Sequence, residues 1–470
     1  MSTPSLLDSA LVGCQTEFGS KAALLGHDLA LLHVGYEDRI YFTSDSVEDL
    51  GKRLRNATEQ EALARRATFF QPMHQARSRL GQGVHDRAEA YIFAGGEITD
   101  NDREGIARHL PVHAQSIAVA EKVVGPGEVW DLTLRGDRWK CDDRDELYTA
   151  VNVGRLILHP GAAIIVRGNI LSLLCQEVCC LGDADEFQIQ LLPTPFSVDP
   201  GSGPHHGAHG EHGEYARPGI DAAPVNAQPL LLGYQLLGAM PEGDGCGGKG
   251  RDGRDGADGG QGRNGGMCYL AELTFRNVCG PLGIYSRAGQ GGAGGNGGDG
   301  GNGGYGGRGR DGYPLFSGLL LPGAAGNGGD GGHGGRGGNG GSGGISSNIY
   351  ISVPPLCESQ VRCFSEASIG GPAGSGGQGG QPGAGGSGGI AHHFPSTVAN
   401  GSHGAAGLPG TRGANGKPGK SRPGAAFFLN NRTLWSTRGL ASLFSIPTED
   451  KEITNEQQLE FPRESRSAGP

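Results

Sequence analysis

Glycine recurs at every third position in five runs of this chain, and this register constrains the fold more than any other feature. The runs cover residues 247–265, 291–312, 323–344, 371–389 and 401–419, and none of the frames is interrupted. A period of three fits the polyproline-II helix, an extended backbone with three residues per turn and no internal hydrogen bonds. A flexible linker needs no fixed phase, so the register favours an ordered structure over the alternative of disorder.

The composition argues against a single large hydrophobic core. Glycine accounts for 91 of 470 residues, while 36 % of residues are hydrophobic and 6 % are aromatic. Glycine has no side chain to bury and loses the most backbone entropy on ordering. The N–H and C=O groups of an extended rod point outward and need partners. Bare glycine faces let neighbouring rods approach closely, so we expect hydrogen bonds between rods to replace a core in this part of the chain.

Two architectures use a glycine period of three, the collagen triple helix and a bundle of polyglycine-II rods folded from one chain. Collagen-like chains carry about 15–20 % proline, whereas the first two runs contain none. Residues 291–296 read Gly-Gly-Ala-Gly-Gly-Asn, which leaves two bare faces on the rod. We therefore favour the bundle and keep collagen as the alternative. Runs 247–265 and 401–419 mostly have one glycine per triplet, so they are expected at the edges and the other three runs inside.

The connectors between the runs are of two alternating kinds. Residues 267–290 and 345–369 are long and strand-like, whereas residues 313–325 and 390–400 are short loops. If consecutive rods run antiparallel, the strand-like connectors meet at one end of the bundle and the loops meet at the other.

Ahead of the glycine runs the chain looks like an ordinary mixed protein. Residues 147–192 contain short apolar strands separated by turn signals at Pro160-Gly161 and Gly168-Asn169. Two stretches of residues 1–146 have helical spacing. The predicted fold class is mixed, with an N-terminal α/β or α+β module, a central β-sandwich or short β-solenoid, and a C-terminal antiparallel bundle of polyglycine-II helices.

The predicted domains follow the same order. They are an attachment or assembly module (1–146), a β-rich region (147–200), a Gly/His/Pro-rich linker or partial rod (201–245), the polyglycine-II bundle (246–424), and a closing strand with a flexible tail (425–470).

A histidine cluster is the first candidate for chemistry. His205, His206, His209 and His212 lie within eight residues, and imidazoles bind borderline metals such as zinc or nickel. The glycines between them keep the triplet phase, so the alternative is a partial rod with solvated histidines. A metal site here would support the second functional hypothesis, an enzyme or enzyme subunit with the bundle as scaffold.

Cysteines and acidic residues give weaker signals. Cys175, Cys179 and Cys180 follow a predicted strand, where adjacent side chains point to opposite faces, so buried free thiols are the expected reading. An acidic cluster at residues 142–146 is expected to be a solvated turn, with a cation site as the alternative.

The short loops at the far end carry the candidate ligand-binding residues. These are Tyr313, Phe316 and Leu320 in one loop and His392, His393 and Phe394 in the other. Exposed aromatic and apolar loops on a rigid scaffold often bind a partner. The alternative is that the loops only cap the bundle by packing on each other.

Charge and hydropathy exclude some functions. A net charge of −10 argues against nucleic-acid binding, which needs a cationic face. No segment approaches the ~20 continuous apolar residues of a membrane span. Residues 1–20 show no basic region followed by an apolar stretch, so we expect cytoplasmic synthesis with reduced cysteines. Later release into an extracellular or virion assembly is compatible with that.

The glycine runs resemble a known architecture, that of phage tail-fibre tip adhesins of the polyglycine-II sandwich type. The motif Gly-Gly-Asn-Gly-Gly-Asp-Gly-Gly at residues 294–301 carries this resemblance, which covers about residues 245–424 and concerns the repeat type only. In that family a rod bundle carries variable distal loops that recognise a bacterial surface. Snow-flea-type antifreeze proteins have similar rods, but an ice-binding face needs small regular polar side chains.

These features predict a non-enzymatic structural protein without a cofactor. We expect a rigid rod bundle that forms a homo-oligomer or larger assembly, or docks on a partner, and binds a surface receptor through its loop end. Self-assembly into filaments is the third hypothesis.

Overall fold

The computed structural model describes residues 6–32, 36–69, 83–136, 146–194 and 205–434. Residues 1–437 belong to one compact unit. Most of the acidic cluster, Asp142, Asp143 and Asp145, and the predicted tail from residue 438 onward lie outside the described residues.

Two sheets form the first part of this unit, which we call the head, and the chain adds strands to them alternately. The larger sheet has the order β1-β2-β4-β6-β10-β15-β17-β18, with β11 also paired to β6, and the smaller has the order β16-β12-β7-β5-β3. The strands of the larger sheet are β1 (Glu37–Ser44), β2 (Val112–Val124), β4 (Leu147–Leu158), β6 (Asn169–Cys180), β10 (Ala271–Phe275), β11 (Val278–Cys279), β15 (Ile349–Ser352), β17 (Phe427–Leu429) and β18 (Arg432–Leu434). The strands of the smaller sheet are β3 (Val129–Asp131), β5 (Ala163–Arg167), β7 (Ile189–Leu192), β12 (Leu282–Arg287) and β16 (Val361–Glu366).

Neighbouring strands in the head mostly run parallel. In the larger sheet only the end pairs β1–β2 and β17–β18 are antiparallel, and every pair in the smaller sheet is parallel. Parallel sheets need both faces covered. Alternate residues of β4, β6, β10, β15 and β17 therefore point into a core shared with the smaller sheet, where Val151, Leu173 and Leu273 are buried.

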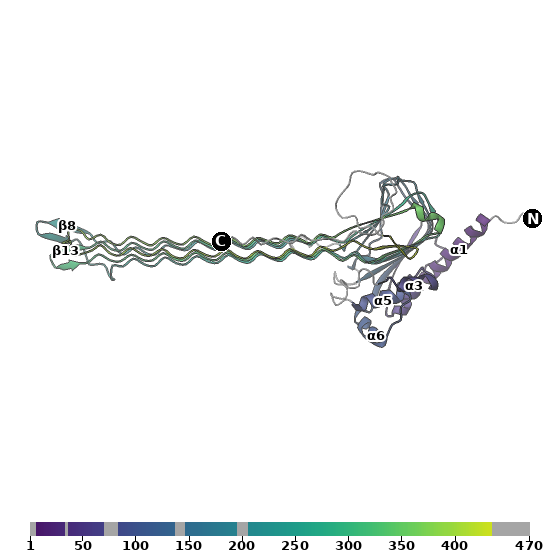
Figure 1. The fold of residues 1–470 in the computed structure, drawn as a ribbon, viewed down its shortest axis with the longest axis horizontal. Coiled ribbons are helices and arrows are strands. Elements are labelled where there is room, and N and C mark those ends of the chain that lie inside the picture. Colours follow the sequence, from purple (N-terminus) through teal and green to yellow (C-terminus); the bar gives the residue numbers. More distant parts are fainter. Residues whose placement is uncertain (1–5, 33–35, 70–82, 137–145, 195–204, 435–470) are drawn as a thin grey trace, which may run out of the picture. The chain divides into compact units, whose positions relative to one another are not determined.

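Helices cover the other face of the larger sheet (Figure 1). They are α1 (Leu6–Leu25), α2 (Val47–Leu54), α3 (Glu59–Arg66), α5 (Gly83–Ala94) and α6 (Asp100–Ile106), followed by the 3₁₀ turn η1 (Ala107–His109); a second 3₁₀ turn, η3 (Pro355–Gln360), precedes β16. The α3 helix begins with a capping box between Thr58 and Glu61. Leu50 and Phe93 from the helices pack on Tyr148, Tyr350 and other residues of this second core.

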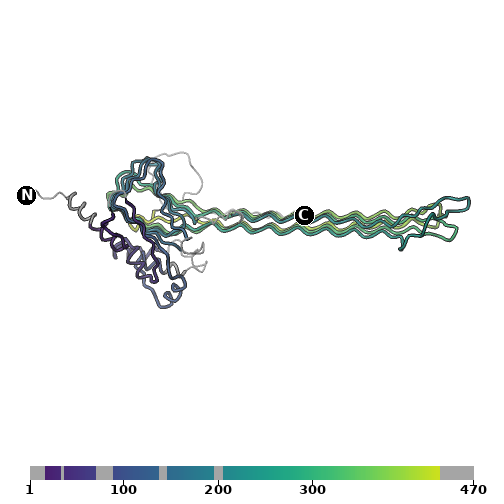
Figure 2. The backbone as a smooth tube through the Cα atoms, turned by 180° about the vertical axis from the view of Figure 1, so that it is seen from behind, coloured from purple at the N-terminus to yellow at the C-terminus, as the bar shows by residue number. Residues whose placement is uncertain are grey.

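Six extended glycine-rich segments, which we call the glycine array, leave the head side by side (Figures 1 and 2). Main-chain hydrogen bonds link them at steps of three residues, and their register shows two layers of three parallel segments each. One layer contains residues 205–222, 291–312 and 371–389, and the other contains residues 247–265, 323–344 and 401–419. The segments of one layer run in the opposite direction to those of the other. Each segment therefore has parallel neighbours in its own layer and antiparallel neighbours in the other layer.

One triplet of a middle segment shows how the array satisfies its donors. The Gly294 N–H donates to the Pro372 carbonyl in the same layer (2.9 Å), and the Gly295 N–H donates to the Gly260 carbonyl in the other layer (2.9 Å). The third N–H, that of Asn296, donates to Nδ1 of His209 (2.9 Å). All three main-chain donors of the triplet therefore have partners.

The third position of the Gly-Gly-X triplet supplies side-chain acceptors throughout the array. Asn296, Asp299 and Asn302 each accept the N–H of a residue in the next segment of their layer, at 2.7–2.9 Å. The other layer repeats the arrangement with Asp252, Asp255, Asp258 and Asn264. This requirement explains why Asn, Asp and His recur at this position.

Proline in the array is confined to outer segments, which have no segment beyond them on one side. The prolines are Pro218, Pro372, Pro382, Pro409 and Pro418. The middle segments 291–312 and 323–344 contain none. Their glycine N–H groups donate to segments in both layers, and proline would remove such a donor.

At the end of the array away from the head lies a four-stranded sheet with the order β14-β13-β9-β8. Its strands are β8 (Ala227–Leu230), β9 (Gly233–Leu236), β13 (Tyr313–Leu315) and β14 (Gly318–Leu320). We call this sheet, together with the loop 390–400, the tip.

The predicted fold class is wrong. The structure is mostly sheet, with mixed sheets in which parallel pairs dominate, and no helical bundle occupies residues 246–424. The N-terminal strands β1–β3 do not form a separate α/β or α+β module, because they pair into the same two sheets as the later strands. The glycine segments do not form an antiparallel bundle either, since each also has parallel neighbours. The run expected inside at 371–389 lies at an edge.

Candidate functional site: the tip

Two adjacent hairpins build the tip. In the first, Leu230 pairs with Gly233 across a turn formed by Leu231 and Leu232. In the second, Leu315 pairs with Gly318 across a turn formed by Phe316 and Ser317. Gly233 (φ 140°) and Gly318 (φ 142°) close the turns in a backbone conformation that other residues rarely adopt. The Phe316 N–H donates to the Tyr234 carbonyl (3.2 Å), which ties the hairpins together.

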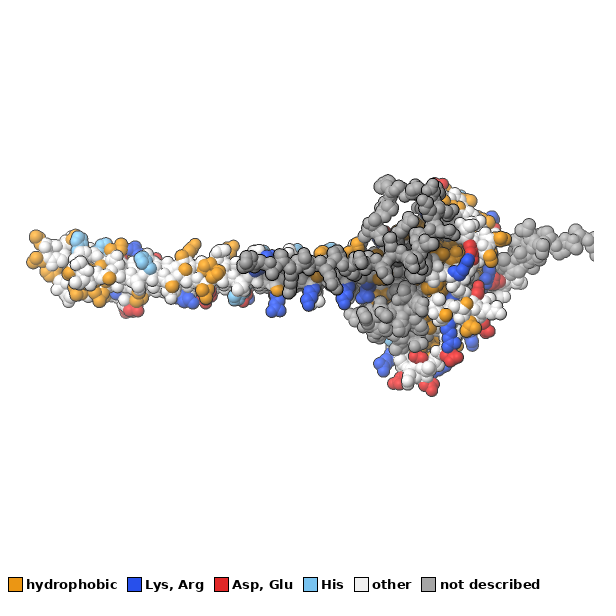
Figure 3. Space-filling model, in the orientation of Figure 1, with side chains coloured by type: hydrophobic (Ala, Val, Ile, Leu, Met, Phe, Trp, Pro, Cys, Tyr) orange, Lys and Arg blue, Asp and Glu red, His pale blue; other side chains and the backbone are white. Residues whose placement is uncertain are grey.

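Large apolar side chains at these turns are open to solvent. Leu231 is 104 % exposed and Leu232 is 86 % exposed. Two-residue hairpin turns normally use Gly, Asn or Asp, so the leucines are not explained by turn geometry. Phe316, Leu319 and Leu321 are also exposed, and hydrophobic side chains gather at this end in Figure 3. Exposed apolar side chains gathered in this way make the tip the candidate binding surface.

Aromatic rings form a stacked cluster behind the turns. Tyr313 stacks on His392 with ring centroids 4.9 Å apart and planes 9° apart. Tyr234 lies 5.1 Å from Tyr313 and 5.5 Å from His393. His393 adopts a positive φ of 54°. The cluster joins the loop 390–400 to both hairpins.

Asp311 anchors the base of this cluster. Its carboxylate accepts the Ile390 N–H (2.8 Å) and lies 3.0 Å from Arg308 and 3.5 Å from His392. Burial acts to raise the pKa of Asp311, but the Ile390 N–H, Arg308 and His392 together hold that pKa below its ordinary value. Burial and the charge of Asp311 raise the pKa of Tyr313, so its hydroxyl stays neutral near physiological pH.

The predicted loop residues come together only in part. Tyr313, His392 and His393 share the aromatic cluster, and Phe316 is exposed at a turn. Leu320 is 8 % exposed and packs inward, and Phe394 is half-buried.

Sequence reasoning missed the β8–β9 hairpin, which it placed in the linker 201–245. The Leu230–Leu232 run followed by Gly233 is the signal that could have revealed it.

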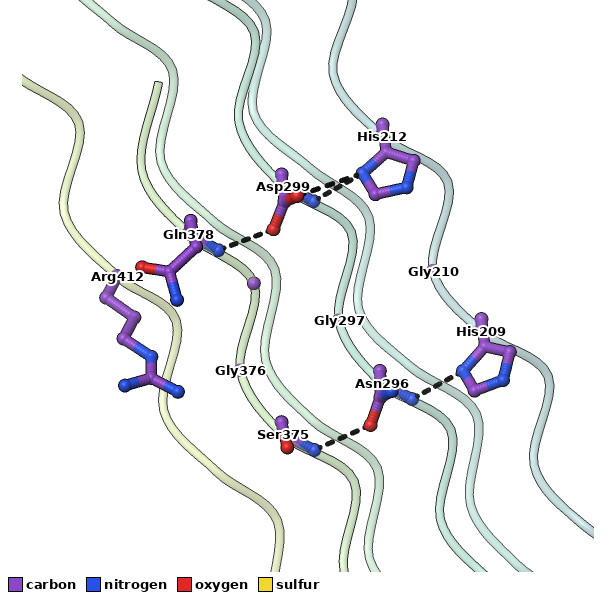
Figure 4. A pocket seen from close by; sticks show the side chains of 11 residues that line it. His209, Gly210, His212, Asn296, Gly297, Asp299, Ser375, Gly376, Gln378 and Arg412 are labelled. Carbon is purple, nitrogen blue, oxygen red and sulfur yellow. Dashed lines mark hydrogen bonds and ion pairs between the residues drawn. The ribbon is translucent and has the colours of Figure 1, made fainter. Parts of the chain in front are cut away.

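The four histidines lie along one segment rather than around one point. Nδ1 of His206, His209 and His212 each accepts a main-chain N–H from residues 293, 296 and 299, at 2.9–3.0 Å. Figure 4 shows His209 and His212 on one side of a groove whose other side holds Arg412. Each of these three histidines keeps only Nε2 for another partner. Zinc or nickel binding at this segment stays a prediction.

The cysteines expected to be buried thiols divide into two groups. Cys175 and Cys180 are buried, and burial raises the pKa of Cys175 and raises that of Cys180 to about 12. Cys179 is partly exposed.

Comparisons with protein-family models, with curated proteins and with solved structures found no match to this chain. Among the described residues, no helix has the length and apolar character needed to cross a membrane.

Proposed function

We propose that this protein is a non-enzymatic structural protein that presents an apolar binding tip on a rigid shaft of glycine segments. The observation that carries the proposal is the pair of tip turns whose leucines, Leu231 and Leu232, are almost fully exposed. The resemblance of the repeat to phage tail-fibre tip adhesins supports a surface receptor as the ligand.

The bonding of the array supports its role as a shaft. Hydrogen bonds recur at every triplet between segments within a layer and between layers. Hydrogen bonds at every third residue restrain each segment along its whole length. The array can therefore hold the tip at a fixed distance from the head.

The head supports the assembly part of the proposal. Strand β1 lies at the end of the larger sheet, and among the described strands only β2 pairs with it. An exposed strand edge can accept a further strand from a second copy or a partner. We propose that the protein forms a homo-oligomer or docks on a partner through this end of residues 1–146.

A cell-binding experiment tests the tip. Fluorescently labelled full-length protein is incubated with a panel of intact bacterial cells, and the cell-bound fraction is measured. The triple variant L231S/L232S/F316S is expected to bind at least tenfold more weakly, since burying even one such side chain contributes ~1.5–3 kcal/mol and about 1.4 kcal/mol corresponds to tenfold in affinity. The control is L408S, which removes a leucine that is 70 % exposed on the side of the array. Equal binding by the triple variant and the wild type would contradict the proposal.

Mass determination combined with negative-stain microscopy tests assembly. The proposal predicts oligomers joined at their heads with free tips. Monomeric particles at all concentrations would contradict the assembly part, and filaments joined along their arrays would favour the filament hypothesis.

A further inference from the structure

Two neighbouring residues of β6, a glutamate and a cysteine, meet a cysteine from a distant part of the chain on the outer surface of the head. Cys179 in β6 and Cys279 in β11 lie directly opposite each other on neighbouring parallel strands. Glu177 lies two residues before Cys179 on the same strand, so the two side chains share a face. The carboxylate and the two sulfur atoms all lie within 4.8 Å of one another. Among the described residues this is the only group of three such ligand atoms at that separation.

The separation suits a tetrahedral metal ion. Zinc binds cysteine sulfur at about 2.3 Å and carboxylate oxygen at about 2.0–2.2 Å, so its sulfur ligands lie roughly 3.8 Å apart. Small rotations of exposed or half-exposed side chains bring the three atoms to that distance. Two thiolates with one carboxylate form a donor set for a thiophilic divalent cation rather than for calcium or magnesium, which prefer oxygen alone.

Neighbouring side chains can free the Glu177 carboxylate for a metal ion and orient the Cys279 sulfur. Arg155 lies 3.1 Å from Glu177 but also 3.6 Å from Glu121, so its guanidinium keeps a carboxylate partner when Glu177 turns to a metal. The Asn277 side-chain amide donates to the Cys279 sulfur (3.7 Å), and such outer hydrogen bonds orient metal ligands.

We propose that Glu177, Cys179 and Cys279 form a binding site for a thiophilic divalent metal ion such as zinc, with solvent as the fourth ligand. The ion ties β6 to β11, where residues 169–180 meet a strand about 100 positions later in the chain. Its role is structural. It fixes β11, which lies in the connector between segments 247–265 and 291–312 of the glycine array, to strand β6 of the head.

Cobalt titration of the reduced full-length protein tests the site. Co²⁺ is expected to bind one equivalent with the visible bands of a tetrahedral complex and a near-ultraviolet sulfur-to-cobalt band, and Zn²⁺ is expected to displace it. The sulfur band excludes binding at the histidines of residues 205–212. The C279S variant should lose the band. The matched control C246S removes another exposed cysteine and should bind as the wild type does.

A second variant keeps the test decisive if C279S folds poorly. The E177Q variant retains both thiols but loses the anionic oxygen, so its affinity for Co²⁺ should fall about tenfold or more. Unchanged affinity in E177Q, or a sulfur band that survives in C279S, would overturn the proposal. Protein purified without reductant that contains a Cys179–Cys279 disulfide and binds no metal after reduction would overturn it as well.

Discussion

Arg65 and Glu272 form a buried ion pair although 207 residues separate them in the chain. Neither side chain is more than 1 % exposed. Glu272 also accepts the main-chain N–H groups of Asn56 (2.9 Å) and Ala57 (3.2 Å). Arg65 donates to Ser352 (3.0 Å) and lies over the ring of Tyr350. The pair therefore joins helix α3 to strands β10 and β15. These strands follow segments 247–265 and 323–344, in which the chain returns from the tip to the head.

Breaking this pair should strongly destabilise the head. Removing one partner leaves a buried charge without compensation, which costs about 3–5 kcal/mol. We expect R65M and E272Q each to lower the free energy of unfolding of the head by that amount in chemical denaturation. The double variant R65M/E272L should recover part of the loss, because it removes both charges together. A loss below about 1 kcal/mol in both single variants would contradict this account of the pair.

The side-chain acceptors of the array predict a local effect at one amide. Asp299 accepts the Gln378 N–H at 2.7 Å. The D299A variant leaves that N–H without its partner, so the Gln378 amide should exchange faster with solvent. The D299N variant keeps an Oδ1 acceptor and should retain protection. Equal exchange at Gln378 in wild type, D299N and D299A would show that the contact contributes nothing.

A glycine of a middle segment should not tolerate even a methyl group. A Cβ added at Gly335 would overlap the main-chain carbonyl of Ala257 in the neighbouring segment. Because backbone cannot move aside as a flexible side chain does, G335A should destabilise the array by about 1–3 kcal/mol or more. The control is R336A at the next, exposed residue. Thermal unfolding followed by circular dichroism should separate the two, and equal midpoints would contradict the close approach of the segments.

The head should lose stability in acid through Glu37. Its carboxylate contacts Arg39 (2.6 Å) and Lys122 (3.1 Å) and accepts from Trp130 (3.0 Å). Burial acts to raise the pKa of Glu37, but Arg39 and Lys122 hold that pKa below its ordinary value. A depressed carboxyl pKa stabilises the fold above the unfolded-state value and loses this contribution as the pH falls through the folded-state value.

The Glu37 effect is measured as a difference between two proteins. Urea unfolding of wild type and E37Q from pH 7 to pH 3 should show wild type more stable at neutral pH and a difference that shrinks below about pH 4.5. A difference that stays constant over this range would contradict the assigned role.

The sequence period located the glycine segments but not their partners. Gly295 bonds to Gly260, and Gly294 bonds to Pro372, and a period of three alone does not order the segments within layers. The period also predicts an inner position for the run at 371–389, whereas the structure places this segment at the edge of its layer.

Other features depend on pairings that local patterns do not reveal. Helical spacing predicts a separate module at the front of the chain, with one helical stretch at residues 99–123. In the structure the second half of that stretch belongs to β2, which pairs with β4 along ten residue pairs. Glu272 lies in an otherwise apolar strand, and its partner Arg65 belongs to a distant helix. At the tip, the sequence predicts Tyr313 and His392 as loop residues. It does not predict Leu231 and Leu232, because they lie in the segment interpreted as a linker.

Hydrogen–deuterium exchange of residues 291–344 in the purified full-length protein tests the central claim most directly. If main-chain hydrogen bonds between glycine segments hold the array, the amides of both middle segments should exchange far more slowly than those of an unstructured chain. Exchange of all these amides at the unprotected rate would contradict the account.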